Sequence, residues 1–476
     1  MNHHATAIDA TPCHVDLAII GSGSAAFATA IAATRLNASV VMVEHDRVGG
    51  TCVNVGCIPS KALLAAADAH HDALDARFPG VATHADPVDM PALIAGKDAL
   101  VDALRDEKYV DLASLYGFEI VHGHARFRED ATLEVNGRTI AAAHYVIATG
   151  ATPWTPPLPG VEATGLLTST SAMDLDHIPA SLIVVGASAV GLEQSQLFTR
   201  LGCTVTLVEA LPRIAPVEEP EVSGALSEIL TSQGVTLHVA STVTSVARDA
   251  DGVVVTLDTP EGSRRLHAEQ LLLATGRRPV TDALGLDTVG VVTGPRGEVV
   301  VDEHLRTTNP RIFAAGDVTG LPQFVYVAGA HGSVVAENAL RDAQRTLDYR
   351  ALPRVTFTSP QIASVGLTEA QADHAGIDCE CRTLSLTNVP RAIVSRDARG
   401  VAKLVAERAT GRVLGIHLLA QGAGDAILAG VYALEANFTV DQLASLWAPY
   451  LTMGEAIKLT AQSFTRDITE LSCCAV

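Results

Sequence analysis

The chain has 476 residues, of which 48% are hydrophobic and 18% are charged, which excludes a disordered protein and allows roughly two to four domains. Its 53 acidic and 33 basic residues give a net charge of −20, which argues against binding to nucleic acid or to an anionic membrane. Eight cysteines are too few for a disulfide scaffold, so the position of each cysteine matters more than their number.

The N-terminal region shows no sign of a targeting segment. The first sixteen residues contain Asp9 and Asp16 and no lysine or arginine, so they lack the basic region of a secretion signal. The longest uncharged run, 17–34, is interrupted by glycine and serine and is rich in alanine, which favours a strand, a turn and a helix over a membrane span. We therefore expect a soluble, cytoplasmic protein.

The first chemical motif lies in that uncharged run. Residues 15–20 are predicted to form a buried parallel strand that leads into Gly21-x-Gly23-x-x-Ala26 and an alanine-rich helix, and the next strand ends in Glu44. Glycines at these places let the backbone approach a pyrophosphate, and the helix N-terminus attracts its charge. Glu44 follows Gly21 by 23 residues, which is suitable for hydrogen bonds to a ribose. A plain structural turn is the alternative, but the order of the elements favours a dinucleotide site.

The same unit recurs in the middle of the chain. A predicted strand over 182–185 precedes Gly186, Ser188 and Gly191. The following predicted strand, over 204–208, ends in Glu209, again 23 residues after the first glycine. Ser188 stands where the second glycine is usual, so the backbone is expected to approach the phosphates less closely. Each unit closes on an apolar strand followed by Ala-Thr-Gly, ending at Gly150 and Gly276. Two units imply two dinucleotides, most simply a flavin and a nicotinamide; the alternative is a duplicated fold in which one site is lost.

Residues 49–61 carry the strongest local pattern, in which Cys52 and Cys57 are separated by four residues. Such a pair can close a small disulfide across the start of a helix, and Pro59 suits a first helical turn. A helix N-terminus and the nearby Lys61 both favour a thiolate over a thiol. Two ordinary buried cysteines are the alternative, which these flanking residues disfavour.

These motifs resemble the FAD-dependent pyridine nucleotide–disulfide oxidoreductases, the group that contains glutathione reductase and dihydrolipoamide dehydrogenase. The resemblance covers almost the whole chain, including 312–317, which is similar to the second FAD motif of the family, and 355–369, which is similar to the start of its dimerisation domain. It implies an α/β fold with two Rossmann-like domains, a C-terminal α+β dimerisation domain, and a homodimer with active sites shared between subunits. The expected domains are FAD-binding 1–152, NAD(P)H-binding 153–278, a return to the FAD-binding or central domain 279–347, and dimerisation 348–476.

The resemblance also implies the residues of the cofactor sites. Cys57 is expected to be the thiolate on the flavin side and Cys52 to face the substrate, while Lys61 and Glu193 form an acid–base pair beside the flavin ring. The residues expected to contact FAD are Gly21, Gly23, Ala26, Glu44, Gly50, Thr51, Lys61, Ala125, Gly150, Asp317 and Val325. The residues expected to contact NADPH or NADH are Gly186, Ser188, Gly191, Glu209 and Gly276.

Near the C-terminus the sequence departs from the dithiol-handling members of the family. Those members carry a histidine five residues before a glutamate, but here Tyr450 precedes Glu455 at that spacing. A phenol with a pKa of about 10 is a poor general base at neutral pH, so ordinary disulfide turnover is disfavoured. The chain ends with adjacent Cys473 and Cys474, which suit a soft metal better than an intrachain disulfide. A prenylation box and a redox-active tail are the alternatives, and the former lacks a basic stretch before it.

Together these features resemble the family members that reduce Hg(II) to elemental mercury with NAD(P)H. The resemblance implies that Cys473 and Cys474 of the partner subunit take Hg(II) from its small-thiol complexes and pass it to the inner cysteine pair. Tyr109 and Tyr450 are expected to line that inner site, and the metal ligands are Cys52, Cys57, Cys473 and Cys474. A disulfide reductase of the lipoamide type and a mercury-sequestering flavoprotein without turnover are the alternative functions.

The other cysteines have no counterpart in the resemblance. Cys203, Cys379 and Cys381 are expected to be structural. Cys13 lies among the residues before the first predicted strand, and these are too few for the small N-terminal metal-binding domain that many Hg(II)-reducing members carry.

The nicotinamide preference is predicted from charge. A carboxylate at Glu209 can accept hydrogen bonds from both ribose hydroxyls of NADH, but it repels the 2′-phosphate of NADPH. Arg213 is the nearest basic residue, and Glu218, Glu219 and Glu221 are expected to add negative charge. We therefore expect NADH to be used at least as well as NADPH, although the Hg(II)-reducing members generally use NADPH.

Overall fold

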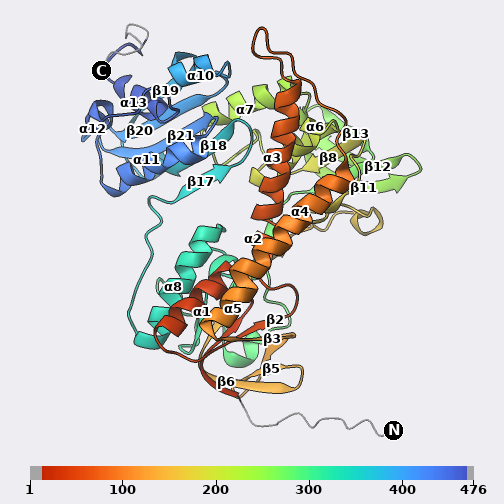
Figure 1. Cartoon of the computed structure of the whole chain (residues 1–476), viewed down its shortest axis with the longest axis vertical. Helices are drawn as coiled ribbons and strands as arrows, with labels where there is room; N and C mark the ends of the chain where they lie inside the picture. The colour runs from red at the N-terminus through yellow and green to blue at the C-terminus, as the bar shows by residue number, and fades with distance from the viewer. Residues whose placement is uncertain (1–12, 469–476) are drawn as a thin grey trace. The chain divides into compact units, whose positions relative to one another are not determined.

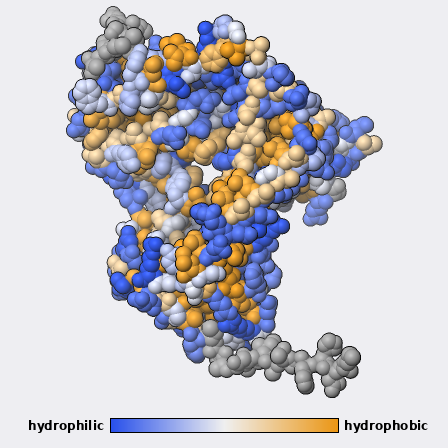
Figure 2. Space-filling model, viewed as in Figure 1, coloured by the Kyte–Doolittle hydropathy of each residue, from blue (hydrophilic) through white to orange (hydrophobic). Residues whose placement is uncertain are grey.

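The computed structural model describes residues 13–468 (Figure 1). The chain divides into two compact units, which are described separately. The first unit comprises 1–62, 94–154 and 276–347, and the second comprises 63–93, 155–275 and 348–476. Hydrophilic and hydrophobic residues are interspersed on the face shown in Figure 2. Within residues 13–468, no helix is long and apolar enough to cross a membrane.

The first unit is built on a seven-stranded sheet in the order β3-β2-β1-β6-β5-β4, with β16 beside β6. The strands β3, β2, β1, β6 and β16 are parallel, whereas β4, β5 and β6 form an antiparallel meander. The strand bounds are β1 Cys13–Ile20, β2 Val40–Glu44, β3 Glu119–His122, β4 Ala125–Phe127, β5 Leu133–Val135, β6 Arg138–Ile147 and β16 Ile312–Ala314. The predicted strand over 15–20 is thereby confirmed as part of β1.

Strand β1 is buried on both faces, as is usual for a central parallel strand. Leu17 and Ile19 face the helices α1 (Ser24–Arg35) and α8 (Val325–Arg341), whereas Ala18 and Ile20 face the core formed with the meander. The two helices lie side by side, and Gly332 of α8 permits this, because a Cβ there would lie 2.3 Å from a carbonyl oxygen of α1 (Figure 1). This packing fixes the N-terminus of α1 at the carboxyl edge of the sheet.

The remaining elements of the first unit surround that edge. A short antiparallel ribbon pairs β7 with β15. Two helices, α3 and α4, have residues in both units. The bounds are α2 Gly50–Asn54, α3 Cys57–Leu74, α4 Met90–Arg105, the π-helical turn η1 Asp106–Val110, α5 Asp111–Tyr116, β7 Ala151–Pro153, β15 Arg277–Pro279 and the 3₁₀ turns η4 Leu286–Val289 and η5 Gly316–Thr319.

The second unit contains a second parallel sheet, in the order β10-β9-β8-β14, and a three-stranded antiparallel sheet. Its predicted strands over 182–185 and 204–208 are confirmed within β8 and β9. The bounds are η2 Val161–Ala163, η3 Ser171–Asp174, β8 Ser181–Val185, α6 Ala189–Arg200, β9 Thr204–Val208, α7 Pro220–Ser232, β10 Thr236–His238, β11 Thr242–Asp249, β12 Gly252–Thr259, β13 Gly262–Ala268 and β14 Gln270–Leu273.

The same unit ends in a five-stranded antiparallel sheet in the order β17-β18-β21-β20-β19, with helices packed against it. Strand β21 is buried along its whole length and forms the centre of this core, whereas β19 is an edge strand. The bounds are β17 Pro353–Thr356, β18 Gln361–Gly366, α9 Glu369–His374, β19 Cys379–Ser385, η6 Leu386–Asn388, α10 Pro390–Val394, β20 Val401–Glu407, β21 Val413–Ala420, α11 Ala423–Glu435, α12 Val440–Ser445 and α13 Glu455–Gln462.

Candidate functional site

The glycine turn after β1 leaves bare backbone at the start of α1. Gly21 has a φ of +106°, and a Cβ there would lie 2.3 Å from the carbonyl oxygen of Ala148. Gly23 immediately precedes α1, and a Cβ on Gly50 would lie 2.6 Å from its Cα. The N–H groups of the first helical turn and the positive end of the helix therefore face a space that side chains do not fill, which suits a pyrophosphate.

A cavity of about 670 Å³ adjoins this turn, within the usual range for a cofactor or ligand site. Among the residues predicted to contact FAD, those that line it are Gly21, Gly23, Glu44, Gly50, Thr51, Ala125 and Gly150. Ala26 is fully buried in the core between α1 and the sheet, where a small side chain allows close packing. The glycine cradle and the cavity fit the adenosine and pyrophosphate parts of FAD.

Glu44 is held in place at the rim of this cavity. One of its carboxylate oxygens accepts a hydrogen bond from the Ser22 hydroxyl at 2.5 Å, and the other accepts the backbone N–H groups of His45 and Asp46 at 2.8 Å. The side chain is buried, and its fixed position suits hydrogen bonds to ribose hydroxyls. Sequence reasoning missed His45 and His124, which also line the cavity with ring centroids 4.9 Å apart.

The two redox cysteines lie on consecutive helices. Cys52 belongs to α2 and Cys57 is the first residue of α3, so the predicted position at a helix N-terminus is confirmed. They are not joined by a disulfide in this structure. The pKa of the Cys52 thiol is raised, first because it hydrogen bonds to Cys57 and then because it is buried, while the charge of Lys61 acts in the opposite direction. Cys52 therefore retains its proton when the pair begins to ionise.

Tyr109 lies close to this pair. It belongs to the π-helical turn η1, a local geometry that often marks functional sites, and its ring packs edge-on against Phe27 with centroids 4.9 Å apart. Burial raises the pKa of its phenol, and the charges of Cys52 and Cys57 act in the same direction. The structure thus brings together Cys52, Cys57, Lys61 and Tyr109, as the resemblance implied.

Arg277 is a site residue that the sequence did not reveal. Its guanidinium donates hydrogen bonds to the Thr51 hydroxyl at 3.3 Å and to the carbonyl oxygen of Ala151. Burial lowers the pKa of Arg277, and the negative charges of Asp317 and Cys57 oppose that shift. The only signal in the sequence is that Arg277 directly follows the second Ala-Thr-Gly.

Asp317 lies beside that arginine in the 3₁₀ turn η5. Burial raises the pKa of its carboxyl group, and the charge of Arg277 counteracts this. The preceding turn is held by His331, a fully buried residue of α8 whose Nδ1 accepts the N–H of Gly316 at 3.1 Å. Burial lowers the pKa of His331 to about 4, so the ring is neutral at pH 7 and serves as an acceptor. Val325, also predicted to contact FAD, is the first residue of α8.

The second glycine turn repeats the geometry of the first within the second unit. Gly186 has a φ of +100°, and a Cβ on Gly191 would lie 1.8 Å from its carbonyl oxygen, so helix α6 approaches the turn too closely for any side chain there. Ser188 has φ −89° and ψ −174°, close to the −78° and −171° of Gly23. The serine therefore adopts the backbone conformation of the usual glycine without strain. Gly276, the last glycine of the second Ala-Thr-Gly, has a φ of +112°.

Glu209, predicted to contact the ribose of the nicotinamide, directly follows β9. Its buried carboxylate accepts the backbone N–H of Ala187 at 2.7 Å and that of Leu211 at 2.9 Å. Arg213 instead donates two hydrogen bonds to the carbonyl oxygens of Pro216 and Glu218, at 2.9 and 3.0 Å. The nearest basic group is thus engaged within its own loop.

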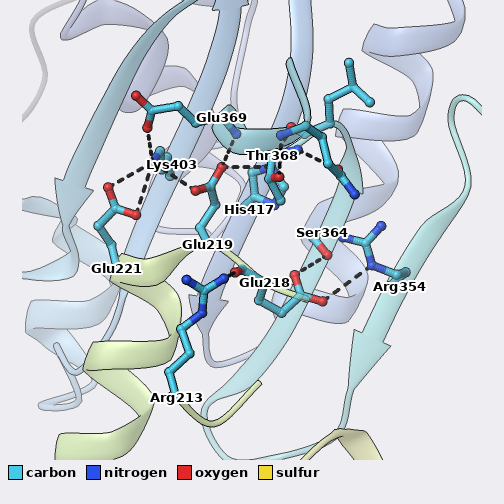
Figure 3. Close-up of polar contacts among 12 residues, drawn as sticks. Arg213, Glu218, Glu219, Glu221, Arg354, Ser364, Thr368, Glu369, Lys403 and His417 are labelled. Carbon is cyan, nitrogen blue, oxygen red and sulfur yellow. Dashed lines mark hydrogen bonds and ion pairs between the residues drawn. The ribbon is translucent and has the colours of Figure 1, made fainter. Parts of the chain in front are cut away.

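The three glutamates that follow Arg213, which are expected to add negative charge to the nicotinamide site, pair with cations of the five-stranded sheet. Glu218 accepts a hydrogen bond from the Ser364 hydroxyl at 2.7 Å and pairs with Arg354 of β17 at 3.4 Å. Lys403 of β20 contacts Glu219 and Glu221 at 3.0 and 2.9 Å, together with Glu369 (Figure 3). Arg354 offsets the charge of Glu218, and Lys403 is shared by Glu219, Glu221 and Glu369, so these cations offset part of the negative charge of the cluster.

Four predicted site residues are not assembled by the structure. Glu193, on α6, is buried and accepts the N–H of Phe357 at 2.8 Å, but it belongs to the second unit, and its pairing with Lys61 stays a prediction. Tyr450 is half-exposed and lies before α13. Cys473 and Cys474 lie outside the described residues.

Comparison with known proteins is consistent with this geometry. The family model for pyridine nucleotide-disulphide oxidoreductases matches residues 15–332, and the model for the dimerisation domain of that family matches 352–461. The chain belongs to this family. The mercuric reductase of Streptomyces lividans is 59% identical over 466 residues, which cover 97% of this chain and 98% of that protein. The mercuric reductase of Bacillus cereus is 46% identical, over 97% of this chain and 73% of its own length.

Solved structures give the same fold. The HOCl-induced flavoprotein disulfide reductase RclA from Escherichia coli superposes with a TM-score of 0.85 at 30% identity, covering 95% of this chain and all of that one. LpdA from Mycobacterium tuberculosis gives a TM-score of 0.85 at 28% identity, with the same coverage. The predicted glutathione reductase-like α/β fold with a dimerisation domain is confirmed.

Membership of the family makes this chain an FAD-dependent oxidoreductase that uses NAD(P)H. The dimerisation domain supports a homodimer. That domain also exposes large apolar side chains, among them Tyr432 of α11, 62% exposed, and Trp447 after α12, 96% exposed. Such residues are enriched where protein surfaces meet.

Proposed function

We propose that this enzyme reduces Hg(II) to elemental mercury with electrons from reduced nicotinamide. The observation that carries the proposal is the 59% identity, over nearly the full length of both chains, to the mercuric reductase of Streptomyces lividans. Tyr450 supports it, because a tyrosine replaces the proton-handling histidine that dithiol turnover requires. Reduced nicotinamide is a cofactor of the cytoplasm, which supports the expected cytoplasmic location.

Cys57 is proposed as the flavin-side thiolate and Cys52 as the thiol that meets the metal. Bound FAD would carry two electrons from the nicotinamide to this pair. Cys52 retains its proton because its pKa is raised, whereas Cys57 lies at the N-terminus of α3 and close to the positive charge of Arg277. These surroundings support ionisation of Cys57 as the first step.

Metal capture is a thiol exchange in this proposal. Hg(II) carried by two small thiolates passes to Cys52 and to the Cys57 thiolate, and the two departing small thiolates take up the Cys52 proton and one proton from solvent. Two electrons from reduced FAD then convert Hg(II) to Hg(0), which leaves the two cysteine sulfurs reduced and free for the next ion. Because its pKa is raised, Tyr109 stays a neutral phenol beside the pair. It is therefore a polar neighbour of the metal that does not compete with the cysteines as an anionic ligand.

In this proposal the partner subunit delivers Hg(II) to the inner cysteine pair. Cys473 and Cys474 of the partner subunit take Hg(II) from small thiols, and Tyr450 of the partner subunit lines the inner site. Glu193 and Lys61 form the acid–base pair beside the flavin ring. Direct exchange between thiolates is favourable because soft metals bind soft sulfur ligands tightly, and it avoids the release of a free ion.

The relay is tested by changing Cys473 and Cys474 to alanine. Turnover of Hg(II) carried by bulky thiols should fall sharply, whereas small halide complexes, which reach the inner pair directly, should be affected less. Equal loss with both forms of substrate would argue against the relay. Mixed dimers that carry the inner and the tail substitutions on different subunits test whether the site is shared.

A disulfide reductase is the second candidate, because RclA of Escherichia coli is named a disulfide reductase and shares this fold. One assay separates the functions: loss of mercury as vapour that depends on NAD(P)H, run beside NAD(P)H oxidation with lipoamide and with glutathione disulfide. We expect vapour release with Hg(II) and negligible turnover of the disulfides. Disulfide turnover without vapour release would overturn the proposal in favour of the second candidate, and tight binding without either would indicate sequestration.

Variants of the inner pair sharpen this test. Cys52→Ala or Cys57→Ala should abolish vapour release and leave FAD bound, because the cavity of the flavin is formed by other residues. Cys57→Ala should also remove the long-wavelength thiolate–flavin absorbance of the two-electron-reduced enzyme. Cys203→Ala is the matched control, because Cys203 is a buried cysteine of the second unit. Persistence of the absorbance in Cys57→Ala would reassign the flavin-side thiol.

A further inference from the structure

Two cysteines outside the redox pair lie together on the edge strand β19. Cys379 and Cys381 pair with Glu407 and Val405 of β20, and because they alternate along the strand they point to the same face of the sheet. Both belong to the second unit, whereas the redox pair belongs to the first. The exposure of both is intermediate, so small molecules in solution can reach them.

A helix covers the face on which these thiols lie. Both cysteines pack against a small apolar cluster made of Ala372, Val405 and Leu414. The Cys379 Sγ lies 3.7 Å from a carboxylate oxygen of Asp373 on α9. Strand β19, helix α9 and this apolar cluster together form a partly enclosed site for a ligand that prefers sulfur.

The spacing of the thiols favours a bridging atom over a disulfide. Alternate residues of a strand are about 6.6 Å apart, at the upper end of the Cα separations that disulfides span. The Cys379 and Cys381 side chains are nevertheless close enough to hydrogen bond to each other. A linear arrangement of two metal–thiolate bonds of roughly 2.3 Å needs sulfur atoms about 4.6 Å apart, which small rotations about the two Cα–Cβ bonds can supply.

The charges around the pair select the kind of ligand. Burial raises the pKa of Cys381, and the charge of Glu369 acts in the same direction, whereas the charge of Lys403 opposes it. Burial and the charge of Asp373 raise the pKa of Cys379. Bare thiolates are therefore disfavoured here. A dication that replaces the two thiol protons leaves the net charge unchanged, so the carboxylates do not oppose its binding.

The number of side chains available as metal ligands limits which cations the pair can bind. Among residues 13–468, no group of three or more His, Cys, Asp and Glu side chains is arranged to hold a metal ion. A tetrahedral Zn²⁺ site needs four ligands, whereas soft cations are satisfied by two thiolates. The pair thus suits a cation that accepts linear coordination by two sulfur atoms.

We propose that Cys379 and Cys381 form a second thiol site that binds one soft, two-coordinate dication such as Hg(II). The binding step is an exchange: Hg(II) held by two small thiolates forms bonds to both cysteine sulfurs, its two original bonds break, and the departing thiolates take up the two cysteine protons. No electrons are transferred. The site does not depend on Hg(II) reduction, and it replaces the purely structural role expected for these cysteines.

The test uses the full-length, FAD-loaded protein with Cys52, Cys57, Cys473 and Cys474 changed to alanine. HgCl₂ is added in the presence of an excess of a small monothiol, the protein is separated by gel filtration, and the mercury retained per chain is measured. Loss of two titratable thiols and an ultraviolet mercury–thiolate absorbance report the bonds formed. We expect one retained Hg(II) per chain and no retention of Zn²⁺.

Further substitutions in that background identify the ligands. Either Cys379→Ser or Cys381→Ser should weaken retention by roughly a hundredfold or more, because two linked thiols hold the ion much more tightly than one. Changing Cys13 and Cys203, the two other cysteines that remain in this background, to alanine is the control, which should retain one Hg(II). Retention of one Hg(II) in either serine variant, loss in the control, or retention of Zn²⁺ would overturn the proposal. FAD content and circular dichroism verify folding, and if Cys381→Ser fails to fold, the more exposed Cys379 supplies the decisive variant.

Discussion

Replacing Glu209 by alanine or by glutamine is expected to improve catalysis with NADPH while affecting catalysis with NADH much less. The carboxylate of Glu209 is fixed at the end of β9 by the N–H groups of Ala187 and Leu211, so it cannot turn away from a phosphate without losing both hydrogen bonds. Arg213, the only basic group expected to offset it, is bonded to two carbonyl oxygens of its own loop. We therefore expect the native enzyme to use NADH at least as well as NADPH.

The size of the effect follows from simple electrostatics. Two unit charges about 4 Å apart interact by about 4 kcal/mol at the effective dielectric constant of a protein surface, and solvent and counterions at an open site reduce this severalfold. Loss of the Glu209 charge should therefore raise kcat/KM for NADPH by about tenfold, which corresponds to about 1.4 kcal/mol. In the variant the ribose hydroxyls of NADH lose one hydrogen-bond acceptor but can bond to water instead, so kcat/KM for NADH should change less.

The measurement is kcat/KM for both cofactors in the wild type, Glu209→Ala and Glu209→Gln. The glutamine variant keeps an oxygen for one backbone N–H and so separates the loss of charge from disturbance of the loop. Glu228→Gln is the matched control, because Glu228 is an exposed carboxylate on α7 of the same unit. A wild type that prefers NADPH by tenfold or more would refute the reasoning and would show that Glu209 does not face the ribose.

Three further predictions concern single residues. Gly191→Ala should abolish reduction of the flavin by NAD(P)H in rapid-mixing experiments and leave FAD content unchanged, because its Cβ would lie 1.8 Å from a carbonyl oxygen; Gly224→Ala, where the space is open, should have no effect. The pKa of about 4 that burial gives His331 means that the unfolded chain binds a proton more readily than the folded one between about pH 6.5 and 4, so stability should fall by about 3 kcal/mol as the pH decreases through that window. Thermal unfolding at several pH values should show this slope in the wild type and not in His331→Asn. Lys403→Met leaves the carboxylates around it without their cation and should destabilise the protein by about 3 kcal/mol at pH 7, and the loss of melting temperature should shrink at acid pH as those groups protonate.

The parts of the fold that sequence patterns predicted are those determined by short stretches of chain. Strands β1, β8 and β9 begin and end within two residues of their predicted bounds, because each is an apolar run that ends at a glycine or an acidic residue. Cys57 was placed correctly at the start of a helix for a similar reason, since Pro59 and the preceding glycine confine the helix start to a few residues.

The parts that could not be predicted depend on residues far apart in the chain. Arg277 reaches Thr51, 226 positions earlier, and no local pattern distinguishes it from the arginine beside it. His331 acts as an acceptor because the first unit buries it completely. Nothing in the local sequence distinguishes it from the other histidines. Lys403 meets Glu219 across 184 residues, so no local pattern predicts that a cation pairs with this glutamate.

The ion pairs of the glutamates make the preference between NADH and NADPH simpler to analyse. Counted along the chain, four carboxylates and one guanidinium compete for influence over the nicotinamide ribose. In the structure the three carboxylates that follow the loop pair with Lys403 and Arg354, and the guanidinium of Arg213 donates to backbone carbonyl oxygens. Of the five charged groups, Glu209 is the one predicted to contact the ribose, and backbone N–H groups hold its carboxylate. The preference between NADH and NADPH therefore depends mainly on one carboxylate, and substitution of that residue should be sufficient to change it.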